Sequence, residues 1–123
     1  MGGPLEPEMV GVLVHTSEAR FPEMRRFYAE ILGLGPRSDR EGFVSFEWGR
    51  IRLTLHLHDR VGGAATDPDR VLLNFEVDDL ATWHQRLLAA GTPCLRTPGA
   101  EPWGGEVATY SDPDGNLIQL IQF

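Results

Sequence analysis

The sequence predicts an α+β domain in which two similar halves share one curved mixed sheet. The first observation is a repeat with a period of about 60 residues, in which each half runs strand, helix and then two or three strands. The second is length: a half of about 60 residues buries too little surface to be comfortable alone, whereas 123 residues support one domain. A concave sheet of this kind forms a cup, and cups bind small ligands.

The first half is expected at residues 9–60, after a flexible arm at residues 1–8 that contains two prolines and two glycines. Apolar runs suit buried strands, and apolar residues at helical spacing predict the helix. Proline fits its first turn, and Gly33 or Gly35 fits its end. The expected elements are a strand at 9–15, a helix at 21–32 and strands at 42–48 and 50–58.

The second half, at residues 70–123, repeats this order after a linker at 61–69 that is rich in Gly, Pro and Asp. Asp78 or Asp79 caps its helix, and Gly91 ends it. The sequence DPDGN predicts a hairpin turn because its glycine takes the position that needs a positive φ. Strands are expected at 71–77, 93–96, 106–111 and 117–123.

Composition excludes several classes of protein. A net charge of −7 argues against a nucleic-acid backbone or an anionic membrane as partner, and no apolar run is long enough to span a bilayer. The absence of lysine excludes Schiff-base chemistry and a P-loop lysine. The single cysteine, Cys94, cannot form an internal disulfide. With this free thiol and no export signal, we expect a cytoplasmic protein.

Three segments, in order, resemble the vicinal oxygen chelate superfamily, which includes glyoxalase I, extradiol dioxygenases and the bleomycin and fosfomycin resistance proteins. They are FYAEILGL at 27–34, FEVDDL at 75–80 and DPDGNLIQL at 112–120, and they are similar to the family patterns FYxxxLGL, fxVdDl and DPDGNxxEL. The match spans nearly the whole of residues 9–123. The resemblance implies a single domain of paired βαβββ modules and, commonly, a homodimer.

Enzymes of this superfamily usually hold one divalent metal ion with four side chains, typically two histidines and two glutamates. The resemblance carries these positions to Gly11 or Leu13, Arg52, Leu72 and Gln119. None of them is His, Asp or Glu, and an arginine repels a cation. We therefore expect no metal cofactor. The departure favours the metal-free members of the family, which bind and sequester drugs.

Seven side chains are candidates for ligand binding. Strand alternation places Arg52 and His56 on one face, which the resemblance makes the lining of the cup. Arg52 pairs either with a ligand carboxylate or phosphate or, internally, with Glu76 or Glu47. Trp103, on a Gly-rich loop, either stacks on a flat ligand or covers the rim of the core or a dimer contact. The seven are His15, Arg52, His56, Asn74, Glu76, Trp103 and Gln119.

The leading hypothesis is a metal-free protein that binds a small, partly aromatic molecule in its cup, as in resistance by drug sequestration. The acidic chain suits a cationic or neutral drug, whereas Arg52 favours an anionic group. One alternative is a lyase, isomerase or dioxygenase whose metal has displaced ligands such as His15, His56 and Glu76. Another is acid–base catalysis without metal by Glu76 and a histidine. The expected partners are a small molecule and a second copy of the chain.

Overall fold

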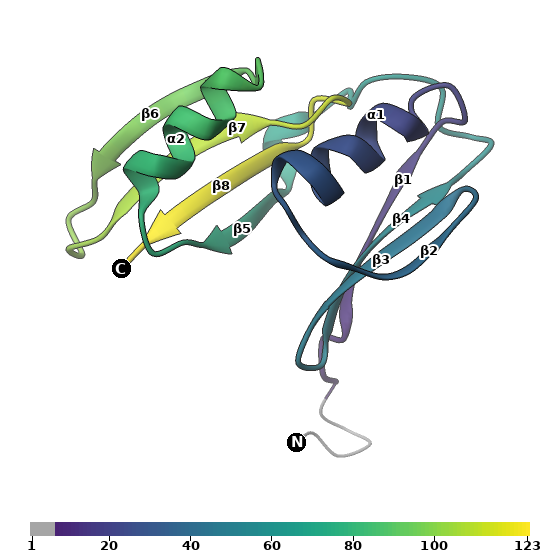
Figure 1. Cartoon of the computed structure of the whole chain (residues 1–123), viewed down its shortest axis with the longest axis horizontal. Coiled ribbons are helices and arrows are strands. Elements are labelled where there is room, and N and C mark those ends of the chain that lie inside the picture. Colours follow the sequence, from purple (N-terminus) through teal and green to yellow (C-terminus); the bar gives the residue numbers. More distant parts are fainter. Residues whose placement is uncertain (1–6) are drawn as a thin grey trace.

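A computed structural model describes residues 7–123 and confirms the α+β fold class, with two four-stranded mixed sheets. The first sheet contains β1 (Gly11–Thr16), β2 (Pro36–Arg40), β3 (Phe43–Trp48) and β4 (Ile51–Leu57), in the order β1-β4-β3-β2. The second contains β5 (Leu72–Glu76), β6 (Cys94–Ala100), β7 (Glu106–Ser111) and β8 (Leu117–Gln122), in the order β5-β8-β7-β6. Figure 1 shows the two sheets beside each other. We call the two halves the first and the second module.

The expectation of one shared sheet is corrected, because among the described strands no hydrogen-bonded ladder joins the two sheets. In each sheet, the strands that come first and last along the chain are parallel neighbours: β1 with β4, and β5 with β8. The other pairings are antiparallel. A parallel neighbour has to be reached by a crossover, and a helix supplies it in each module. The repeat is therefore one of topology, with each module completing its own sheet.

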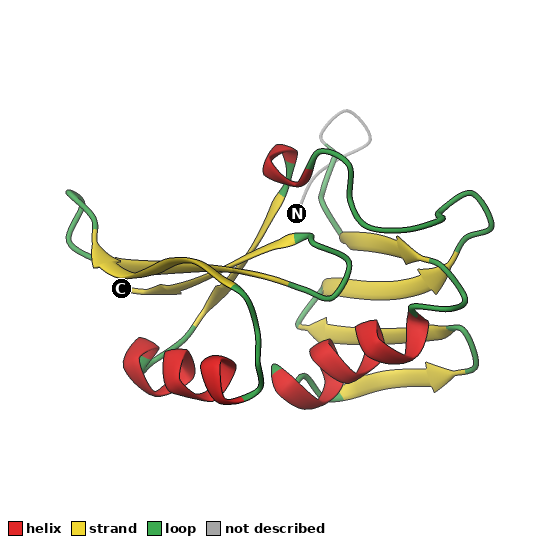
Figure 2. Cartoon of the chain, turned by 90° about the horizontal axis from the view of Figure 1, so that it is seen from above, coloured by secondary structure: helices red, strands yellow, loops and turns green. Residues whose placement is uncertain are grey.

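Each module has its helix on one face of its sheet, and Figure 2 shows both helices on the same side of the molecule. In the first module, α1 (Phe21–Arg26) continues into a π-helical turn, η1 (Phe27–Ile31), and Gly33 follows it with φ +72°. In the second, α2 (Leu80–Ala89) is capped by Asp79, whose carboxylate accepts a 3.1 Å hydrogen bond from the backbone N–H of Thr82. Within residues 7–123, no helix is long and apolar enough to cross a membrane.

Two strands differ from the sequence predictions. The sequence does not predict β2, because Pro36–Arg40 is polar and lacks the apolar alternation that marks a half-buried strand. It pairs only with β3 at the edge of its sheet, so little of it needs to be apolar. β6 continues to Ala100 instead of ending at Arg96, and register shifts interrupt its pairing with β7. Of the arm expected at residues 1–8, residues 1–6 lie outside the described part of the chain.

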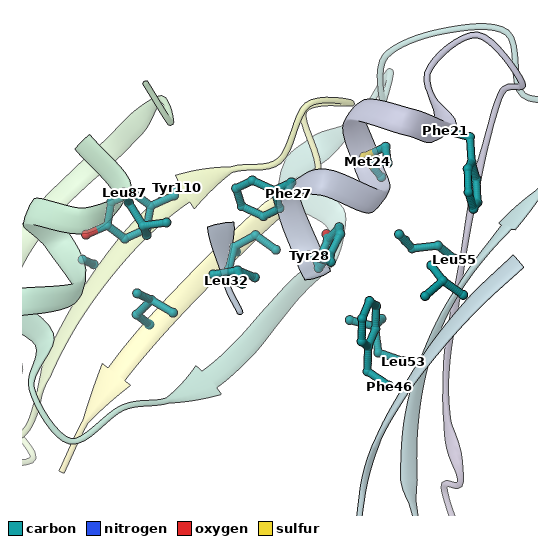
Figure 3. Close-up of a cluster of buried hydrophobic side chains, with 14 of the residues drawn as sticks. Phe21, Met24, Phe27, Tyr28, Leu32, Phe46, Leu53, Leu55, Leu87 and Tyr110 are labelled. Atoms are coloured by element: carbon teal, nitrogen blue, oxygen red, sulfur yellow. The ribbon is translucent and has the colours of Figure 1, made fainter. Parts of the chain in front are cut away.

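The buried side chains of both modules form one continuous hydrophobic cluster. Figure 3 shows Phe21 and Met24 of α1 near Leu55 of the first sheet, and Leu87 of α2 beside Tyr110 of the second. The segment between the modules in this view is the end of the first helix, which carries Phe27, Tyr28 and Leu32. These three side chains are at most 5% exposed. The end of the first module's helix therefore packs into the core that the two modules share.

The turn between β7 and β8 has the predicted hairpin form, with Gly115 at φ +86°. A side chain would be strained at this φ, which explains the glycine. The carboxylate of Asp112 accepts hydrogen bonds of 2.9 Å from the backbone N–H groups of Asp114 and Asn116. The aspartate thus fixes the turn from within, as Asp side chains often do.

The same turn is joined to the first module. The hydroxyl of Tyr28 donates a 2.6 Å hydrogen bond to Asp112, and the hydroxyl of Thr16 donates one of 2.7 Å to Asp114. The guanidinium of Arg20 lies 2.6 Å from the other carboxylate oxygen of Asp114. Both carboxylates are buried, and burial raises the pKa of Asp112 above its usual value. A polar network therefore joins the modules beside their shared core.

Candidate functional site

Each sheet has one face covered by its helix and one open face. In β4, Leu53 and Leu55 are buried toward α1, whereas Arg52 and His56 point to the opposite side. The register carries this parity across the sheet, because β1 and β3 pair with β4 residue by residue. In the second sheet the open face likewise contains Asn74, Glu76 and Gln119. These candidate residues therefore lie opposite the helices, as strand alternation predicts.

Arg52 forms the internal ion pair that is one of its two expected roles. Its Nε lies 2.6 Å from Glu47, which faces it across the β3–β4 ladder. The other oxygen of Glu47 is 3.0 Å from the Nε of Arg37. One carboxylate thus serves two guanidinium groups, and the Arg52 side chain stays 64% exposed. Exposure of this degree leaves Arg52 open to a ligand.

Three histidines gather where β1 and β4 end. His15 pairs with His56 in register, and their ring centroids lie 6.1 Å apart. The ring of His58 is closer to His15, at 4.6 Å. Desolvation, followed by the neighbouring charges of His58 and His56, lowers the pKa of His15 below 6.5. This imidazole is therefore biased toward its neutral form.

Two polar groups lie close to the Nδ1 atom of His58. The backbone N–H of Arg60 donates a 3.1 Å hydrogen bond to its Nδ1, while a carboxylate oxygen of Asp59 lies 3.5 Å from the same atom. An Nδ1 that accepts from an N–H carries no proton of its own. An N–H donor and a carboxylate therefore both lie close to one ring nitrogen of His58.

On the second sheet, two of the candidates contact each other. The amide Nε2 of Gln119 donates a 2.6 Å hydrogen bond to the side-chain oxygen of Asn74, its register partner. Glu76, two residues further along β5, forms no ion pair with the described residues. Among the described residues, no hydrogen bond joins Glu76 to a histidine.

A groove of about 750 Å³ lies between the two sheets and draws residues from both modules. The rings of Trp48 and Phe75 approach to 6.0 Å across it. Arg52 and Glu76 are the charged side chains among its described lining residues, and Asn74 adds an amide. The apolar lining consists of Met9, Val12, Leu32, Leu34, Trp48, Ile51, Leu53, Leu72, Leu73, Phe75, Val77, Trp83 and Leu120. We call this cavity the intermodule groove.

The structure divides the seven predicted site residues. Arg52, Asn74 and Glu76 line the intermodule groove. His15 instead lines a smaller cavity of about 320 Å³ beneath the linker, beside Arg60 and Asp114. His56 and Gln119 stay on the open faces of their sheets, outside both cavities.

Trp103 lies apart from the other candidates. It is 53% exposed, and its ring centroid is 5.6 Å from that of Phe123 at the end of the chain. It lines neither cavity within the described residues. Gly105 allows this packing, because a Cβ there would lie 2.0 Å from the Trp103 ring. Trp103 lies in the loop between β6 and β7, at the edge of the second sheet.

Several groove residues do not follow from the sequence. Phe75 belongs to the helix-facing side of β5, so strand parity alone assigns it to the core. It reaches the groove because the two sheets separate at this edge, which depends on how the modules pack. Trp48 also lines the groove, although most aromatic residues on strands belong to the core. The sequence does not predict Arg37 as a site residue because it does not predict β2. The contact of Arg37 with Glu47 depends on the pairing of β2 with β3.

The residues present do not fit the metal site that the family resemblance implies. Gly11 and Arg52 are direct register partners. The first metal position therefore offers no side chain, and the second offers a cation. A Cβ at Gly11 would lie 2.3 Å from the carbonyl oxygen of Arg52, which excludes a ligand there without backbone movement. At the alternative position, and in the second module, Leu13, Leu72 and Gln119 supply one weak neutral donor.

The displaced ligand set does not assemble within one chain either. His15 and His56 are neighbours on the first sheet, but Glu76 belongs to β5 of the second. In residues 7–123, no three His, Cys, Asp or Glu side chains gather with a geometry that could hold a metal ion. We therefore derive no chemistry through a metal.

Fold and topology together define a protein of paired βαβββ modules, and the comparisons name its family. The model of the Glyoxalase/Bleomycin resistance protein/Dioxygenase superfamily matches residues 18–120. The chain belongs to this superfamily. A bleomycin resistance protein of Klebsiella pneumoniae is 29% identical over 109 residues, which cover 83% of each chain.

Solved structures show the same fold. A glyoxalase-related enzyme from Fulvimarina pelagi superposes with a TM-score of 0.76 at 24% identity, covering 94% of this chain and 88% of that one. A lactoylglutathione lyase from Agrobacterium tumefaciens gives a TM-score of 0.70 at 20% identity, covering 98% and 96%. At these identities the likeness concerns the fold alone.

Proposed function

We propose that this protein binds a small, partly aromatic molecule in the intermodule groove and does so without a metal ion. The observation that carries the proposal is the groove itself, whose volume of about 750 Å³ falls in the range of drug-sized sites. Its walls are apolar, and Trp48 and Phe75 offer ring faces to an aromatic group. A few polar groups among apolar walls are typical of ligand sites.

The role we propose is sequestration of a toxic drug in the cytoplasm. The similarity to a bleomycin resistance protein supports this role. So does the replacement of the family's metal ligands, since the chemistry of its metal-dependent members needs them. Binding alone protects a cell when the protein holds the drug away from its target.

Binding is tested with N-phenyl-1-naphthylamine, a neutral aromatic dye whose fluorescence rises in apolar sites. We expect saturable enhancement, and we expect Trp48→Ala to weaken binding roughly tenfold because it removes a ring face and its buried area. Trp103→Ala is the matched control, since Trp103 is similarly exposed but lies outside the groove. Absence of saturable binding, or an equal loss in both variants, contradicts the proposal.

Sequestration is tested in a sensitive bacterial host that expresses the chain or its Trp48→Ala variant. We expect growth at raised concentrations of an aromatic antibiotic that the protein binds in vitro, and loss of this tolerance in the variant. A host that gains no tolerance to any compound bound in vitro contradicts the resistance role and leaves the binding result intact.

We also propose that a second copy of the chain covers the open faces. Exposed apolar side chains surround the groove and the open face of β1, and burying them in water-excluding contact is favourable. They include Met9, Val10, Leu13, Ile51 and Val71, each at least 43% exposed. Sedimentation should give twice the chain mass of 13.7 kDa, and Leu13→Arg should shift it toward the monomer. A monomer at all concentrations contradicts this assembly.

A further inference from the structure

The open face of the first sheet carries excess positive charge, although the whole chain has a net charge of −7. The guanidinium groups of Arg37 and Arg52 reach this face and share Glu47. That of Arg40 lies 4.6 Å from the centroid of the Phe43 ring, with no carboxylate partner among the described residues. Asp39 points to the other face, where it pairs with Arg25. Three cations thus face one carboxylate on the described strands.

The histidines extend this row across the sheet. The Phe43 ring meets His56 edge-on at 5.6 Å, and His56 is followed by His15 and His58. The row from β2 to β1 therefore contains groups that are either cationic or able to become so. A carboxylate oxygen of Asp59, just beyond β4, lies 3.5 Å from the Nδ1 of His58. The arginines of this face attract a negative group and repel a positive one.

Arg52 connects this face to the intermodule groove, because it belongs to both. Glu47 lies 2.6 Å from its Nε, and the Arg52 side chain stays 64% exposed. Two Nη groups present the planar fork that binds carboxylate, sulfonate or phosphate with two parallel hydrogen bonds. The carboxylate on the opposite wall, Glu76, comes from the second sheet and lies beyond ion-pair distance of Arg52.

We infer that the ligand of the groove is an anion: an apolar or aromatic molecule whose single acidic group pairs with Arg52 while its rings lie against Trp48 and Phe75. This inference rests on the proposed function. It chooses the anion of the two ligand charges that the composition left open, because the arginines of the first sheet's open face adjoin Arg52.

The test compares two dyes that share an anilinonaphthalene body. One is 8-anilinonaphthalene-1-sulfonate, and the other is N-phenyl-1-naphthylamine, which lacks the sulfonate. We expect the sulfonate to bind roughly tenfold more tightly at low ionic strength, the usual effect of one charge-assisted contact. Added NaCl should reduce this preference, because a half-exposed ion pair is screened.

Variants assign the preference to individual residues. Arg52→Gln should abolish the preference for the sulfonate, so that the two dyes bind with equal affinity. Glu76→Gln should strengthen binding of the sulfonate about twofold to fivefold, since it removes a like charge across the groove. Arg96→Gln is the matched control, because Arg96 lies on the second sheet and pairs with Glu101 at 2.6 Å. It should leave both affinities unchanged.

The outcomes separate this inference from the proposed function. If neither dye binds, the proposed groove function fails. If the neutral dye binds and the sulfonate binds equally or more weakly, only the anionic ligand class is overturned. That ligand class is also overturned if Arg52→Gln weakens both dyes alike. Should that variant fail to fold, the salt dependence of the unmodified protein and the effect of Glu76→Gln still decide the question.

Discussion

The hydroxyl of Tyr28 donates a 2.6 Å hydrogen bond to the carboxylate of Asp112, a residue 84 positions further along the chain. Tyr28 lies at the end of the first module's helix, and Asp112 begins the β7–β8 turn of the second module. Both side chains are buried, at 0% and 3% exposure. A buried carboxylate is stable only when hydrogen bonds replace its lost hydration. The bond therefore holds the modules together and solvates an acid in the interior.

Removing the donor tests this relationship. Tyr28→Phe keeps the ring and deletes one hydrogen bond to a buried carboxylate, so we expect the free energy of unfolding to fall by about 1–3 kcal/mol. Urea denaturation measures the change. Tyr110→Phe is the matched control, because the Tyr110 hydroxyl meets His84 at 2.7 Å in a less buried setting. A loss equal to or smaller than the control's would show that the Tyr28 bond contributes little.

The cost of Tyr28→Phe should depend on pH. Burial is the largest influence on Asp112 and raises its pKa above 3.8, while the bond from Tyr28 acts in the opposite direction. Without Tyr28 the pKa of Asp112 rises further, so the folded variant takes up a proton at higher pH than the unmodified protein. The destabilisation is then largest at neutral pH and shrinks as the pH falls through the raised pKa. Denaturation in a series of buffers measures it, and a constant difference contradicts it.

His15 should titrate below 6.5. Desolvation lowers its pKa first, and repulsion from His58 and His56 lowers it further. The folded state then binds this proton less readily than the unfolded chain, so stability present above pH 6.5 is lost as the pH falls toward the folded pKa. Histidine NMR titration measures the midpoint. His58→Gln removes a like charge and should raise the midpoint of His15; an unchanged or lower value refutes the coupling.

Gly11→Ala should destabilise the first sheet. The added Cβ would lie 2.3 Å from the carbonyl oxygen of Arg52, which is backbone and cannot rotate away. We expect a loss of about 1–3 kcal/mol, the usual cost of overpacking. Gly62→Ala is the control, because open space surrounds Gly62 and its φ is not positive. Equal stability of the two variants would mean that β1 shifts freely against β4.

Chelation should leave dye binding unchanged. The four family metal positions offer Gly11 or Leu13, Arg52, Leu72 and Gln119, so we expect no divalent ion to participate in the groove. The affinity for N-phenyl-1-naphthylamine is measured before and after dialysis against EDTA, on protein purified without a histidine tag. Stoichiometric Zn, Ni, Fe or Mn by elemental analysis, together with weaker binding after dialysis, would reverse this expectation.

Much of the fold could be predicted because its signals are local. Helical spacing of apolar residues predicts the first helix, and Asp79 is one of the two predicted caps of the second. The glycine and the aspartates at 112–116 predict the turn. The strand Pro36–Arg40 carries no such signal, because an exposed edge strand needs no apolar face. The separation into two sheets also has no local signal, since it depends on contacts between distant segments such as Tyr28 and Asp112.

For the candidate site, parity predicts which face each side chain occupies but not which faces meet. Arg52 and Glu76 are 24 positions apart and line one groove, whereas His15 and Glu76 do not come together. Which residues meet depends on how the modules pack against each other, and Phe27, Tyr28 and Leu32 lie in the core between them. Glu47 could be predicted as a partner of Arg52 because the two occupy facing strands; the second arginine on Glu47 could not.

The β7–β8 turn, bound by Tyr28, Thr16 and Arg20, also bears on how the chain tolerates being cut. The two modules are held together by this turn and by their shared core. The linker at residues 61–69 therefore contributes less to their association. A break between Gly62 and Gly63, where open space surrounds both glycines, would leave two fragments that each carry a full sheet and half of the mating surface. Such fragments are suited to reassembly when mixed.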